Sequence, residues 1–156
     1  MFRGILAAGA AAALAITAGA ASAELAKWDQ ARVTKYAAEL ETATSDLRQA
    51  LEGYGIQNAT QANAYYQVRE TVKNLDTAAE GLAAALKSGD DRDKTMARYQ
   101  RLQQLRRDAA DQGRRADIPE SVFEKVFSVG SALIKLRPYY QEEPSPEEIQ
   151  EQKGNP

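Results

Sequence analysis

The chain has 156 residues, with 20 lysines and arginines, 22 acidic residues, and neither cysteine nor histidine. This composition excludes disulfides, thiolate or imidazole metal ligands, and every nucleophile that depends on cysteine or histidine. A formal net charge of −2 predicts no nucleic-acid partner. No cofactor is expected, since a haem-binding bundle would need histidine or a cysteine attachment motif.

The first 23 residues have the pattern of a secretory signal peptide. Arg3 supplies an early positive charge, an alanine-rich apolar run follows, and Ala21-Ser22-Ala23 is a small-residue cleavage site. Cleavage would leave a chain that begins at Glu24, with a net charge of −3 instead of −2 because Arg3 is lost. The alternative is an uncleaved anchor, because the run is just long enough to cross a bilayer. Its few strongly apolar residues favour cleavage. We therefore expect a periplasmic or secreted protein whose mature chain does not span a membrane.

Two long segments then have helical periodicity. In the first, from about 25 to 52, apolar residues recur every seventh position: Val33, Leu40 and Leu47. In the second, from about 59 to 87, they alternate in steps of three and four: Tyr65, Val68, Val72, Leu75, Ala79, Leu82 and Leu86. Ser88 and Gly89 close the second segment, and so short a connection predicts that the next helix runs antiparallel.

The third segment, from about 91 to 115, is the most polar. Asp90 or Asp91 is a candidate N-cap, since either side chain can accept from the free amides of the first turn. The apolar face is narrow and consists of Tyr99, Leu102, Leu105 and Ala109. Arginines are frequent around it, so most of this helix is expected to face water.

The fourth segment, from about 119 to 137, is the most apolar. Its apolar residues are Val122, Phe123, Val126, Phe127, Val129, Leu133, Ile134 and Leu136. One polar stripe is expected to face water, formed by Glu124, Ser128, Ser131 and Lys135. The rest of the circumference, including Phe127, is predicted to be core. Pro138 is predicted to end the helix, because the residue before a proline is pushed out of helical geometry.

These segments predict an all-α fold, an antiparallel four-helix bundle of up-down-up-down topology. The bundle is expected to cover residues 24–138, after a cleaved signal peptide at 1–23. Residues 139–156 hold five glutamates, three prolines and one lysine. That composition predicts a flexible, disordered acidic tail.

Candidate functional residues are few, and no catalytic or metal-binding site is predicted. Ser131 and Lys135 lie one turn apart on the solvent stripe, where a lysine keeps its proton. Tyr66 must be exposed if its neighbour faces the core, and exposed tyrosines are enriched at binding surfaces. The tentative partner surface therefore consists of Tyr66, Arg106, Arg107 and Arg114.

These features favour an exported, non-catalytic protein that binds an unidentified envelope protein or serves as its accessory factor. A helix face would make the contact, or the acidic tail would dock or cover the arginines. The alternative is a bundle that holds a small apolar or anionic ligand in a core cavity lined by Ala79, Ala83 and Gly130. An enzyme that uses carboxylates or lysine is the least favoured hypothesis. The oligomeric state stays open.

Overall fold

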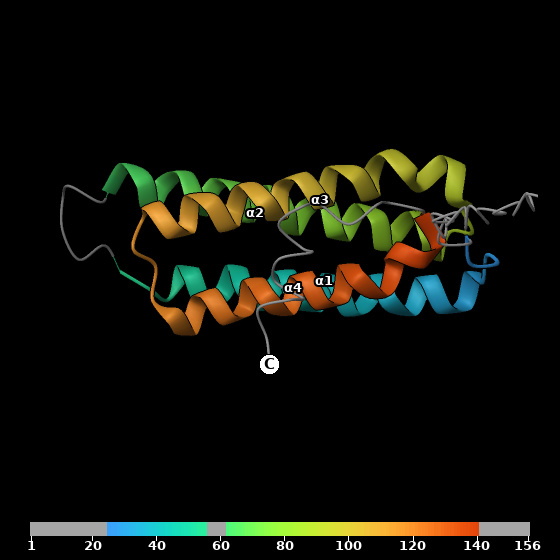
Figure 1. Cartoon of the computed structure of the whole chain (residues 1–156), viewed down its shortest axis with the longest axis horizontal. Helices are drawn as coiled ribbons and strands as arrows, with labels where there is room; N and C mark the ends of the chain where they lie inside the picture. The colour runs from blue at the N-terminus through green and yellow to red at the C-terminus, as the bar shows by residue number, and fades with distance from the viewer. Residues whose placement is uncertain (1–24, 56–61, 141–156) are drawn as a thin grey trace, which may run out of the picture.

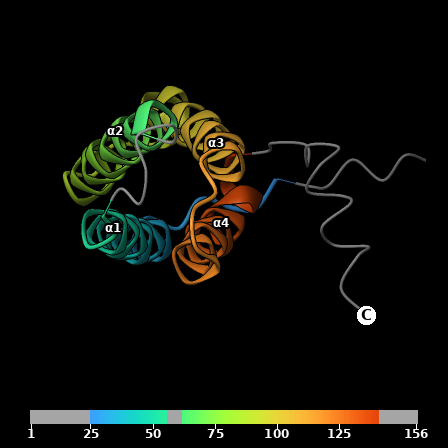
Figure 2. The same ribbon diagram turned by 90° about the vertical axis from the view of Figure 1, so that its left-hand side faces the viewer.

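The computed structural model describes residues 25–55 and 62–140, and these contain four α-helices and no strand (Figure 1). The helices are α1 (Gln30–Glu52), α2 (Ala62–Lys87), α3 (Arg92–Arg115) and α4 (Glu120–Tyr140). Each helix packs against its sequence neighbours and α4 also packs against α1. Viewed along their length, the helices follow one another around a ring in chain order (Figure 2). The predicted antiparallel four-helix arrangement is confirmed, whereas the predicted signal peptide and residues 141–156 of the predicted tail lie outside the described residues.

The core consists of the apolar stripes predicted for the first three helices. A helix buries one face, so residues spaced by three and four point the same way. All the stripe residues of α1, α2 and α3 named above are buried. None of the helices in the described part of the chain has the length and apolar character needed to cross a bilayer.

Two aspartates fix the starts of α1 and α3. Of the two predicted caps of α3, Asp91 is the one that forms, and its carboxylate accepts from the amide of Lys94 at 3.1 Å. Asp29 accepts from the amide of Arg32 at 3.0 Å, so α1 begins at Gln30 and not near residue 25. The tight turn after α2 is also confirmed, with Gly89 at φ 90, a backbone angle that glycine adopts without strain.

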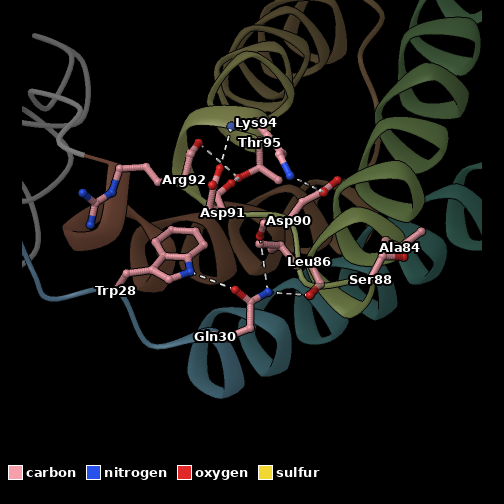
Figure 3. A network of polar contacts seen from close by, with 10 residues as sticks. All are labelled: Trp28, Gln30, Ala84, Leu86, Ser88, Asp90, Asp91, Arg92, Lys94 and Thr95. Carbon is pink, nitrogen blue, oxygen red and sulfur yellow. Dashed lines mark hydrogen bonds and ion pairs between the residues drawn. The ribbon is translucent and has the colours of Figure 1, made fainter.

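Residues 25–29 precede α1 and lie across the end of the bundle. The amide of Ala26 donates to the carbonyl of Pro138 at 2.8 Å, and the Arg92 guanidinium donates to the carbonyl of Ala26 at 3.1 Å. Arg92 also lies over the ring of Trp28, whose indole donates to Gln30 (Figure 3). These contacts tie the start of the described chain to both α3 and α4.

The predicted end of α4 is wrong, because the helix continues through Pro138 to Tyr140. Tyr140 is 2% exposed, stacks on Tyr99 with ring centroids 4.3 Å apart, and shares a 2.8 Å hydrogen bond with Thr95. Tyr139 is also buried. A proline in a helix interior destabilises the helix by about 3 kcal/mol. One buried aromatic side chain stabilises the folded state by a similar amount. Packing of two tyrosines therefore holds the last turn in place, and both belong to the core and not to a tail.

Candidate functional site

Of the four residues of the predicted partner surface, Tyr66 and Arg114 are exposed, Arg107 is half-buried and Arg106 is buried. Tyr66 is 55% exposed, as expected, and lies beside Tyr65 near the start of α2. Arg107 and Arg114 lie seven residues apart on one face of α3, where Arg107 donates to Gln104 and Arg114 pairs with Asp111. Both arginine side chains are therefore bonded within α3.

Arg106 is a correction, since only 7% of it is exposed. It falls in the three-and-four spacing of the buried face of α3, between Leu102 and Ala109, and its guanidinium packs against Gly130 of α4. A Cβ built on Gly130 would lie 3.4 Å from Nη1 of Arg106. The missing side chain of Gly130 thus leaves room for this arginine, which is not available to an external partner.

The three residues predicted to line a ligand cavity are two alanines of α2 and a glycine of α4. Ala79 and Ala83 are packed in the core of α2, and the space beside Gly130 is taken by Arg106. Among the described residues, no group of three or more carboxylate, imidazole or thiol side chains is arranged to hold a metal ion.

The outer face of α4 has an exposed apolar strip. Phe127 is 52% exposed and Ile134 is 46% exposed, although both were predicted to be core. The predicted polar stripe is exposed as expected. Among the helices, however, α4 packs only against α1 and α3, and its buried arc is too narrow for all its apolar residues. At 100° per residue, Phe123, Phe127 and Ile134 fall within an arc of about 40°. They lie on the edge that borders α3.

An open cleft lies at one end of this strip, where α3 turns into α4. Its volume is about 310 Å³. The rings of Phe123 and Phe127 meet edge to face inside it, with centroids 5.8 Å apart. The lining residues are Gly113, Arg114, Asp117, Ile118, Glu120, Phe123, Glu124 and Phe127. Three carboxylates against one arginine, which Asp111 already neutralises, make the cleft acidic.

The turn that forms the cleft has an unusual backbone. Asp117 adopts φ 52, a left-handed conformation that aspartate tolerates better than most residues. The amide of Ile118 then donates to the carbonyl of Gly113 at 3.3 Å, which closes the end of α3. A Cβ on Gly113 would lie 3.3 Å from the Phe123 ring, so glycine allows this ring to pack directly against α3.

Two polar networks between helices were not predicted from the sequence. Asp76 of α2 is buried and accepts from Thr44 at 3.0 Å and from Arg48 at 2.7 Å, both on α1. Lys135 of α4 bonds to Glu39 of α1 at 2.7 Å, and this contact raises the pKa of Lys135 and lowers that of Glu39. Lys135 therefore stays protonated and is no general base for Ser131.

Comparison of the chain with protein-family models, with curated proteins and with solved structures gives no match. Among the described residues, the strip and the cleft of α4 together form an exposed apolar surface.

Proposed function

We propose that this protein is an exported, non-catalytic helical bundle that binds protein through the outer face of α4. The observation that carries the proposal is the exposure of Phe127 and Ile134 on one strip that leads into the cleft. A partner that removes half-exposed large apolar side chains from water stabilises the complex by about 25 cal/mol for each Å² of apolar surface buried. Aromatic residues are also enriched at protein interfaces.

Photocrosslinking in the cells that make the protein tests this function directly. Benzoylphenylalanine placed at position 127 should give covalent adducts with another polypeptide. The same group at position 66 is a matched control, because Tyr66 is equally exposed but lies on α2. Equal adducts from both positions, or none from position 127, would remove the strip from the functional argument.

Export is tested separately, by the intact mass of protein recovered from the periplasm or medium. The expected chain begins at Glu24. Recovery of the full-length chain from the membrane fraction would overturn both the cleavage and the proposed location.

A small ligand is the second candidate function. The volume of the cleft, about 310 Å³, falls at the lower end of the range of small-molecule sites. This candidate differs from the notion of a core cavity, because the cleft opens at the surface. It predicts that a small molecule copurifies with the protein and that Phe123→Ala abolishes its retention, whereas protein binding predicts adducts from position 127.

A further inference from the structure

We infer that the strip on α4 is a self-association surface, through which two copies of this chain form a two-fold symmetric dimer with their α4 helices antiparallel. The inference rests on the proposed function in using the same face, and it names the partner as a second copy.

The strip is symmetric about the point between Gly130 and Ser131. Phe127 lies three residues before Gly130, and Ile134 lies three residues after Ser131. Phe123 lies seven residues before Gly130, and Pro138 lies seven residues after Ser131. From either end, the strip therefore has two apolar residues, two small residues and two apolar residues. All six positions fall within about 100° of the helix circumference. In the antiparallel dimer, Phe127 of each copy packs on Ile134 of the other.

The size of the strip suits helix pairing. From residue 123 to residue 138 it runs about 22 Å, or four turns of helix. Ser131 at its middle is small and exposed, which permits close approach, because interaxial distance is set by the side chains at the contact. A two-fold interface requires a patch that is complementary to itself. Binding of a different protein would not require this symmetry of the strip about its midpoint.

Charge favours the same arrangement. The polar edge beside the strip is acidic near the start of α4, with Glu120 and Glu124, and basic near its end, with Lys135. Antiparallel pairing places Glu124 opposite position 137 of the other copy, so Lys135 of that copy lies about 3 Å further along the axis. Lys135 bonds to Glu39 but is 51% exposed, so it can join a second carboxylate.

Sedimentation velocity on the purified protein, from micromolar to about 1 mM, tests the dimer. The expected mass is twice that of the chain at the upper concentrations. Phe127→Glu should restore the monomer and leave helical circular dichroism unchanged. Tyr66→Glu, which adds the same charge at an equally exposed aromatic residue, should leave the dimer intact. A monomer at every concentration, or a dimer that survives Phe127→Glu, would overturn the inference.

Disulfide crosslinking tests the axis of symmetry, because the chain has no cysteine of its own. Ser131→Cys places one thiol beside the two-fold axis and should give a covalent dimer on mild oxidation. Thr77→Cys, on the exposed face of α2, is the control and should not. Failure of Ser131→Cys to crosslink faster than Thr77→Cys would reject the antiparallel pairing. A monomer whose position 127 crosslinks to a foreign protein overturns only the self-association, whereas a monomer with no adduct overturns the proposed function as well.

Discussion

Tyr140 is the residue whose truncation best tests the structure of the bundle end. Its ring stacks on Tyr99 and meets Trp28 edge to face at 5.7 Å, and its hydroxyl bonds to Thr95. Deleting a fully buried aromatic side chain costs about 3 to 5 kcal/mol. Tyr140→Phe keeps the ring and loses one hydrogen bond, which is worth about 0.5 to 1.5 kcal/mol. We therefore expect the free energy of unfolding to fall by about 3 to 5 kcal/mol in Tyr140→Ala and by about 1 kcal/mol in Tyr140→Phe.

Urea unfolding followed by circular dichroism at 222 nm measures both changes. A chain that ends at Arg137 should be destabilised at least as much as Tyr140→Ala, because it lacks both buried tyrosines. A chain that ends at Tyr140 is the control for the acidic segment beyond the helix. If Tyr140→Ala costs about 0.5 kcal/mol or less, as surface substitutions do, then the stack on Tyr99 does not form and α4 ends before Pro138.

Three further predictions concern α4, alkaline pH and the buried aspartate. Leu133→Ala should destabilise the bundle by about 2 to 5 kcal/mol in urea unfolding, while the half-exposed Phe127→Ala should cost much less; similar losses would contradict the orientation of α4. Burial raises the pKa of Tyr140, so stability should be fully present below about pH 10, the ordinary tyrosine pKa, and fall as the pH rises further, because the unfolded chain ionises first. Tyr140→Phe should flatten that decline, and an unchanged pH profile would argue against burial of the phenol. Asp76→Ala should cost about 1 to 3 kcal/mol, and a double-mutant cycle with Arg48→Ala should show coupling; additive effects would mean that the pair contributes nothing.

The sequence alone predicted most of the bundle. The unbroken three-and-four spacing from Tyr65 to Leu86 is buried throughout, because a helix of that length can hide one face only against other helices. Asp91 and Gly89 likewise act locally, through a side-chain cap and a left-handed backbone, so neighbouring residues were enough to predict Gly89 and to narrow the cap to Asp90 or Asp91. Caps and turns of this kind are formed by neighbouring residues and need few contacts with residues distant in sequence.

The candidate site depended on packing that no local pattern contains. Pro138 was predicted to end α4 because its backbone preference is local, whereas the contacts that overrule it come from Tyr99 and Trp28, which are distant in sequence. Arg106 was expected on the surface because it is charged, but a glycine across the helix interface gives its side chain a buried place. Phe127 was expected in the core because it is apolar, but its seven-residue spacing to Ile134 places both residues on one face, which neither α1 nor α3 covers. Sequence thus determined which faces of the helices are apolar, and only the tertiary structure decided which apolar residues the neighbouring helices cover.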